Sequence, residues 1–208
     1  SVKDSKTSID MKYFINELKC IKNPYVSIAI ISSLLRFVVT VGIRFYLPIF
    51  LVAKFSTNLA LVGLILGFME FVKSFTSLLV GRVSGYWGKD LPFIVSFLVF
   101  GLGCFFLPVV SSVILIFFFM AVIGVADGIL SPLQKSLITQ NTSSKNRGFY
   151  VSINASMQGI GRTIAPVSLG VVVAFFGLSW AFWSMTIISF FPVLHFLVKI
   201  KKLNNFQF

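Results

Sequence analysis

Six apolar stretches, separated by short polar turns, make up most of this chain. Each stretch holds about the 20 largely apolar residues that a helix needs to cross the hydrocarbon core of a bilayer. The sequence therefore predicts six transmembrane helices, at residues 26–50, 59–81, 91–110, 112–136, 149–175 and 178–198. Because a backbone in lipid must satisfy its own hydrogen bonds, the expected class is an all-α, polytopic membrane protein.

The basic residues are spread unevenly over the turns between these stretches. Loops rich in Lys and Arg stay on the cytoplasmic side of a membrane. With the N-terminus inside, thirteen of the 18 Lys and Arg residues fall on cytoplasmic segments, and only Lys54 falls on an outer turn. This asymmetry supports an even number of spans. It predicts a cell-membrane protein with both termini in the cytoplasm.

The same pattern divides the chain into three parts. We expect residues 1–24 to form a cytoplasmic linker, 25–200 the membrane domain and 201–208 a cytoplasmic tail. Within the linker, apolar residues recur at helical spacing over 11–22, with lysines off that face. This is typical of an amphipathic helix on the inner membrane surface, although a solvated linker helix has the same pattern.

Composition limits the possible functions. The chain carries a net charge of +12, which a nucleic-acid-binding protein also has, but here the uneven loops already explain the charge. We therefore expect no nucleic-acid partner. The two cysteines have no metal-site spacing, and no motif of a nucleophile, metal cluster or nucleotide loop is present. We expect no metal or cofactor and no enzymatic activity.

Six ionisable side chains interrupt the predicted spans. They are Arg36, Arg44, Glu70, Lys73, Asp127 and Arg162. Such a group at the bilayer centre costs about 2.5–3.5 kcal/mol on insertion scales, so each needs a partner or a polar cavity. They occur in the first, second, fourth and fifth spans, which predicts that these four line a polar interior while the third and sixth face lipid. Two spans with charged residues followed by one span without them occur twice along the chain, as in a three-plus-three inverted repeat.

Spacing suggests roles for these groups. Glu70 and Lys73 are three residues apart on one helix and can form an ion pair. Four cations against two carboxylates leave two cations without a partner, to be matched by an anionic substrate, a carboxylate outside this chain or water. The substrate-binding candidates are Arg36, Arg44, Arg162 and Gln158.

Glu70 and Asp127 are the carboxylates of the spans, which makes both candidates for proton coupling. The alternative is that they form ion pairs that fix helix register. Glycines also recur at a spacing that lets helices approach closely. The pairs are Gly63 with Gly67, Gly81 with Gly85, and Gly124 with Gly128.

The segment 81–90, Gly-Arg-Val-Ser-Gly-Tyr-Trp-Gly-Lys-Asp, resembles the signature loop Gly-x-Leu-Ala-Asp-Arg-x-Gly-Arg-Lys of the major facilitator superfamily. The residues that fit are Gly81, Val83, Ser84, Gly88 and Lys89, while Gly85 and Tyr86 replace the family's Asp and Arg. Such decay is usual in the second copy of this loop. The segment 159–170, with Ala165-Pro166, resembles the family's eleventh helix, and 11–22 resembles its central cytoplasmic loop.

This resemblance covers nearly the whole chain and implies the C-terminal half of a twelve-helix transporter. It implies a gating loop that includes Gly81, Arg82, Gly88 and Lys89. It also implies alternating access against an N-terminal half, or against a second copy of this chain. The expected cargo is a small organic solute, either anionic or drug-like, moved with proton coupling. A non-transporting six-helix scaffold and a half-size homodimeric transporter are the alternatives.

Overall fold

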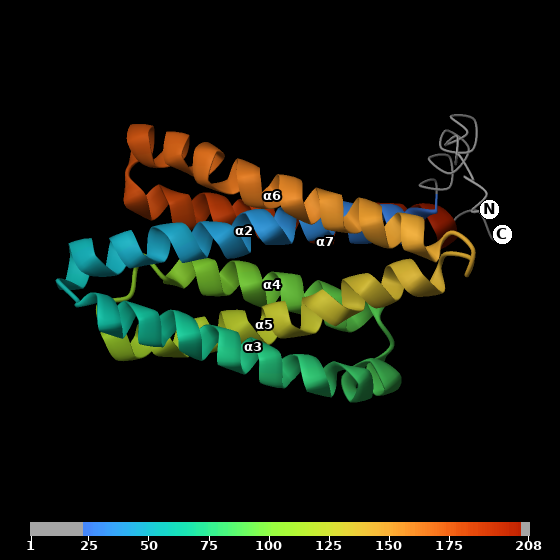
Figure 1. The fold of residues 1–208 in the computed structure, drawn as a ribbon, viewed down its shortest axis with the longest axis horizontal. Helices are drawn as coiled ribbons and strands as arrows, with labels where there is room; N and C mark the ends of the chain where they lie inside the picture. The colour runs from blue at the N-terminus through green and yellow to red at the C-terminus, as the bar shows by residue number, and fades with distance from the viewer. Residues whose placement is uncertain (1–22, 205–208) are drawn as a thin grey trace, which may run out of the picture.

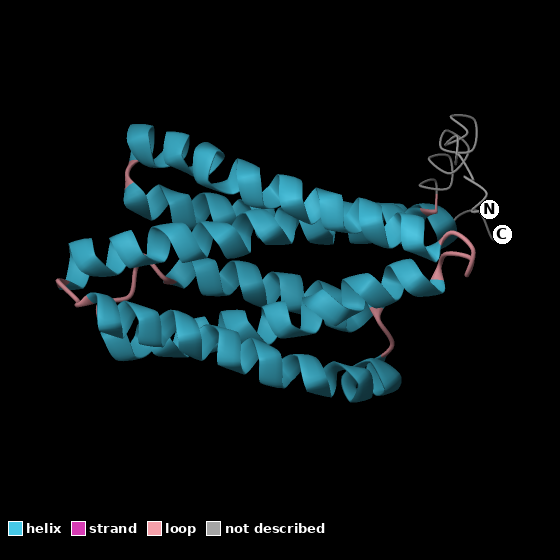
Figure 2. Cartoon of the chain, in the orientation of Figure 1, coloured by secondary structure: helices cyan, strands magenta, loops and turns pink. Residues whose placement is uncertain are grey.

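The computed structural model describes residues 23–204, which form helices joined by short turns (Figures 1 and 2). The helices are α2 (Pro24–Phe55), α3 (Leu59–Trp87), α4 (Asp90–Phe106), α5 (Val113–Gln140), α6 (Arg147–Phe176) and α7 (Leu178–Asn204). The six-helix, all-α prediction is confirmed for this part of the chain. The predicted amphipathic helix at 11–22 lies outside the described residues. The expected boundary at residue 200 falls inside α7, which continues to Asn204.

Local sequence explains where the first two helices begin and end. Asn23 precedes α2 and its side chain accepts a hydrogen bond from the N–H of Tyr25, with Pro24 in the first turn. Asn58 caps α3 in the same way through the N–H of Leu61, at 2.9 Å. Between them, Ser56 takes a left-handed conformation with a φ of 50° and ends α2. Such caps satisfy backbone groups that a helix end leaves open.

Two of the helix ends that differ from the prediction bear on the expected gating loop and on the third span. α3 continues as helix to Trp87, so the segment expected to be a gating loop is largely helical, and only Gly88 and Lys89 form the turn. No breaker precedes Gly88, whose φ of 69° suits glycine. α4 is shorter than the predicted 91–110 span: it has 17 residues and ends at Phe106, just before Pro108. The other five described helices are long and apolar enough to cross a membrane.

The helices pack as two groups of three, with α3, α4 and α5 in one group and α6, α7 and α2 in the other. α3 packs along α5 as α6 packs along α2, and α4 packs on α5 as α7 packs on α2. The contacts between α2 and α5 and between α4 and α7 join the two groups. This is the arrangement of the predicted three-plus-three inverted repeat. In Figure 1 all six helices run roughly along the long axis, and α2 begins at the same end at which α5 meets α6.

α4 and α7 each present an apolar stripe outward. Their exposed side chains are all apolar, apart from Asp90 at the start of α4, as far as residue 198. The stripes are Leu91, Val95, Leu98, Leu102, Phe105 and Phe106 on α4, and Trp180, Ile187, Phe191, Leu194, Leu197 and Val198 on α7. Lipid contact for these two helices stays a prediction that this distribution favours.

Candidate functional site

A close approach of two helices sets the geometry of the site. A Cβ added to Gly124 would lie 2.7 Å from the carbonyl oxygen of Met69, and one added to Gly128 would lie 2.6 Å from that of Lys73. These two glycines therefore let the backbone of α5 touch that of α3, as their spacing predicts. Gly63 and Gly67 behave differently, because a Cβ on either would meet nothing within 4 Å.

Asp127, between the two packing glycines, is fully buried and contacts two cations. Arg36 on α2 donates through Nη1 to its Oδ1, and Lys73 on α3 places Nζ 2.7 Å from its Oδ2. Arg36 is also buried, with 2% of its side chain exposed against 1% for Asp127. Buried charges are tolerated when they are paired in this way.

Gln134 holds Arg36 from a second direction. Arg36 Nε donates to Gln134 Oε1 at 2.9 Å, and Gln134 Nε2 donates to Ser32 Oγ at 3.0 Å. The Nη1 and Nε groups of Arg36 thus both have hydrogen-bond partners on α5. Charge-directed reasoning missed Gln134 because it is neutral. Its position seven residues after Asp127 places it on the same face of α5, which was the available signal.

A second ion pair lies at the surface of the described bundle. Arg44 on α2 bonds to Glu70 Oε1 on α3, with 47% and 39% of the two side chains exposed. Lys73 Nζ is 3.7 Å from Glu70 Oε2, so the predicted pairing of Glu70 with Lys73 is confirmed. Lys73 thereby bridges both carboxylates. Arg36, Asp127, Lys73, Glu70 and Arg44 form one continuous charge network across α2, α3 and α5.

The expectation of two unpartnered cations was wrong by one. Each carboxylate contacts two basic side chains, so Arg36, Arg44 and Lys73 all have a carboxylate partner. Arg162, halfway along α6, is the intramembrane cation for which residues 23–204 show no carboxylate partner. Its guanidinium lies over the Phe37 ring, 4.6 Å from the ring centre, and that of Arg36 lies at the same distance. One aromatic ring thus contacts two cations.

The remaining sequence candidates lie apart from the network. Gln158 is half-buried one turn before Arg162, on the same face of α6. In the turn after α3, Lys89 donates through Nζ to Ser136 Oγ at 2.7 Å and to Gln140 Oε1. The turn is therefore tied to the C-terminal end of α5, where a cation is favourable. Burial lowers the pKa of the Lys89 ammonium. Gly81 and Arg82 lie within α3 rather than in the turn.

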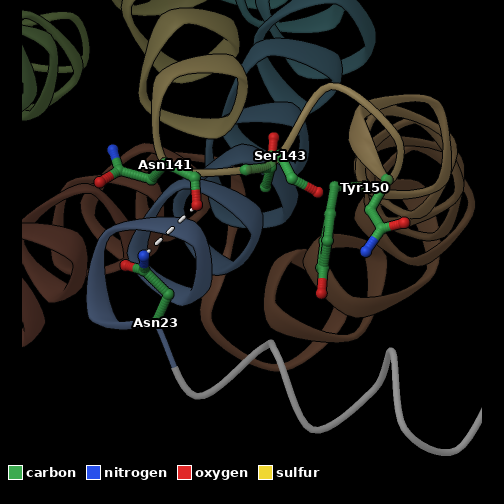
Figure 3. A pocket seen from close by; sticks show the side chains of 6 residues that line it. Asn23, Asn141, Ser143 and Tyr150 are labelled. Carbon is green, nitrogen blue, oxygen red and sulfur yellow. Dashed lines mark hydrogen bonds between the residues drawn. The ribbon is translucent and has the colours of Figure 1, made fainter.

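A polar cavity of about 210 Å³ opens at the end of the bundle where α5 meets α6 (Figure 3). Its lining residues are Asn23, Asn141, Thr142, Ser143, Asn146 and Tyr150. Asn23 Nδ2 donates to the backbone oxygen of Asn141 at 3.4 Å, which ties the start of α2 to the end of α5. Among the described residues no charged side chain lines this cavity, and none of its lining residues belongs to the charge network.

Comparisons with known proteins agree with this architecture. A family model, the Major Facilitator Superfamily, matches residues 28–204. The chain is similar to the "Uncharacterized MFS-type transporter YdeE" of Escherichia coli, with 28% identity over 76% of this chain and 40% of that protein. It is also similar to a "Na(+), Li(+), K(+)/H(+) antiporter" of Planococcus maritimus, with 36% identity over 43% of this chain and 21% of that protein.

A solved structure shares the fold. The POT family transporter PepTSo superposes with a TM-score of 0.74 at 18% sequence identity, covering 85% of this chain and 37% of that one. The chain therefore spans less than half the length of each of these proteins.

Proposed function

Because the chain belongs to the major facilitator superfamily, we propose that it forms the C-terminal half of a secondary active transporter that moves a small organic solute by alternating access. The family match and the transporter relative support a multi-pass membrane protein of a transporter family. A bundle of six helices is what one half of a twelve-helix, alternating-access transporter would contain. The uneven basic loops support a cell-membrane location with the ends of the chain in the cytoplasm.

The partner we propose is an N-terminal half. The chain spans 40% of one relative and 37% of the fold neighbour, so another unit of similar size is expected beside it. α3 and α6 have the most open faces of the bundle, and both carry charged residues near mid-membrane. The open glycines Gly63 and Gly67 would let a further helix pack on α3. A second copy of this chain is the other possible occupant.

Arg162 is the observation that carries the solute proposal. The repeat relates α3 to α6 and α5 to α2, and Lys73 and Arg162 both stand about halfway along their helices. Lys73 meets a carboxylate on α5, whereas Arg162 meets the Phe37 ring and, beyond it, Arg36. Within residues 23–204, no carboxylate stands at the second position. This supports an anionic solute held by Arg162, with Arg44 and Gln158 as further ligands.

The two carboxylates suit different roles in proton coupling. A proton on Asp127 would leave the buried Arg36 without a counter-ion and remove the shorter carboxylate contact of Lys73, and breaking a buried pair costs about 3–5 kcal/mol. Glu70 is half-exposed and its loss of charge would strand no buried cation. We therefore place proton coupling at Glu70, with Asp127 and Arg36 as its structural support.

A second candidate function follows from the relative named as a monovalent cation/proton antiporter. Cation exchange requires a carboxylate that is available to the ion. Both carboxylates of the described spans are already in contact with two basic side chains. The geometry therefore favours an organic anion over Na⁺, Li⁺ or K⁺.

The test is flux through the complete protein in proteoliposomes under an imposed pH gradient. The probes are radiolabelled benzoate, succinate and phosphate for anions, ethidium for drug-like cations, and Na⁺ and K⁺. We expect flux of at least one anion, reduced at least tenfold by Arg162→Gln. Arg147→Gln, which removes an exposed cation from the start of the same helix, should retain it.

Each other result selects an alternative. Flux of ethidium alone indicates a drug exporter, and flux of Na⁺ or K⁺ alone indicates a cation antiporter. No flux above that of empty liposomes favours the scaffold. A particle that contains only two copies of this chain indicates the half-size homodimer.

A further inference from the structure

Building on the proposed function, we propose that the Arg44–Glu70 ion pair is the exchangeable contact of the charge network. A proton taken up by Glu70 frees Arg44, which then holds the anionic group of the solute. The proton and the anion would enter the site together, so this assigns the transporter to proton–anion symport.

The two arginine–carboxylate pairs differ in how the protein holds them. Arg36 and Asp127 are buried, and Gln134 occupies a second edge of the arginine. The Arg44 and Glu70 side chains are each exposed by more than a third, and no other hydrogen bond of either side chain is seen within residues 23–204. Within the described residues, fewer protein groups therefore hold this pair than hold the buried one. The exposed pair can therefore open without unfolding the bundle.

Lys73 decides which pair opens. Its Nζ is 2.7 Å from Asp127 and 3.7 Å from Glu70. When Glu70 is neutral, Lys73 keeps its shorter contact with Asp127, and Arg44 alone loses its counter-ion. The charged groups around Glu70 are Arg44 on α2, Lys73 on α3 and, through Lys73, Asp127 on α5. The charged residue of α4, Asp90, lies at the far end of α3, beside its last turn.

Charge is conserved through this exchange. Three cations and two carboxylates give the network one net positive charge. A proton on Glu70 raises it to two, and a bound monoanion returns it to one. Loading one proton with one monoanion therefore leaves the network charge unchanged. This predicts electroneutral transport of a monoanion, since the loaded and empty networks carry the same charge.

The first experiment needs no knowledge of the solute. Dicyclohexylcarbodiimide modifies protonated carboxyl groups in membrane proteins, and peptide mass spectrometry quantifies the product at each residue. In the complete protein, labelling of Glu70 should rise as the pH falls from 8 to 5, while Asp127 stays unlabelled. At pH 7.5, Arg44→Gln should raise Glu70 labelling several-fold, because an adjacent cation favours the ionised carboxylate.

Two further variants bracket this result. Arg44→Lys keeps the charge and should leave Glu70 labelling near that of the wild type. Arg147→Gln removes an exposed cation from the start of α6, outside the proposed binding residues, and should leave Glu70 labelling unchanged. The proposal is overturned if Glu70 labelling ignores Arg44→Gln, or if Asp127 is labelled before Glu70.

Flux separates this proposal from the one on which it rests. With benzoate, or with phosphate where that is the anion carried, Glu70→Gln should retain exchange of anion across the membrane but lose its dependence on the pH gradient. Flux in Glu70→Gln that still follows the pH gradient overturns the coupling pair and leaves the transporter proposal intact. Absence of flux in the wild type overturns both, whatever the labelling shows.

Discussion

Gly128 of α5 lies so close to Lys73 of α3 that a Cβ would stand 2.6 Å from the lysine's carbonyl oxygen. The charge network depends on this contact, because it brings the lysine beside Asp127. A larger residue at this position must push the two helices apart. The neighbour is backbone rather than a flexible side chain, so it cannot simply rotate away.

Gly128→Ala is therefore expected to destabilise the protein. Overpacking costs about 1–3 kcal/mol, which exceeds the gain in helix propensity of about 1 kcal/mol. Thermal unfolding of the purified protein in detergent measures the change. Gly148→Ala, in the first turn of α6, is the matched control, because its Cβ would meet nothing within 4 Å. An equal melting temperature for both variants would contradict the close contact between α3 and α5.

Asp127→Asn is expected to destabilise more strongly than loss of the whole pair. The single change leaves the buried Arg36 without a counter-ion, at a cost of about 3–5 kcal/mol, and takes from Lys73 the shorter of its two carboxylate contacts. The double variant Arg36→Met with Asp127→Leu removes the buried pair and should recover part of that loss. Unfolding midpoints of the two proteins decide the point. If the double variant is the less stable one, Asp127 does not serve chiefly as a counter-ion to Arg36.

Gln134→Leu is expected to destabilise by about 1.5–3 kcal/mol, the range for a hydrogen bond to a charged group, because Arg36 Nε is left unsatisfied. Ser32→Ala, which removes only the next hydrogen bond, should have a smaller effect. Chemical denaturation of both variants gives the comparison. A larger loss for Ser32→Ala would show that Gln134 does not act through the arginine.

The contacts of Lys54 account for a basic residue in the last turn of α2, where the sequence predicts an outer turn. Its Nζ donates to the carbonyl oxygens of Pro108, at 2.8 Å, and Val110, at 2.7 Å, after the end of α4. Lys54→Met should therefore loosen the turn between α4 and α5. Hydrogen exchange should become faster at residues 107–112 and stay unchanged in the turn between α6 and α7. Unchanged exchange at 107–112 would exclude this capping role.

Sequence alone was enough for the helices and for one ion pair. Length and hydropathy are local properties, and Glu70 and Lys73 are neighbours on one helix. The contacts of Arg36 with Asp127 and of Arg44 with Glu70 join residues 91 and 26 positions apart, so no spacing rule reaches them.

Counting charges gave the wrong number of unpartnered cations, because it assigned each carboxylate one partner. In the structure each has two, and that sharing depends on packing. The predicted end of the second span at Gly81 fell short of the end of α3, because no proline lies between Gly81 and Gly88 and the helix continues to Trp87. The predicted third span ran past the end of α4, because it included Pro108.

The length of α4 has a consequence for the surrounding membrane. At about 1.5 Å per residue, its 17 residues extend roughly 25 Å, against a hydrocarbon core of about 30 Å. Its neighbours are long enough to tilt and still cross. With α4 facing lipid as predicted, hydrophobic mismatch would be concentrated on one side of the molecule, where lipid tails would have to compress. Bilayer thickness would then act on this six-helix bundle asymmetrically.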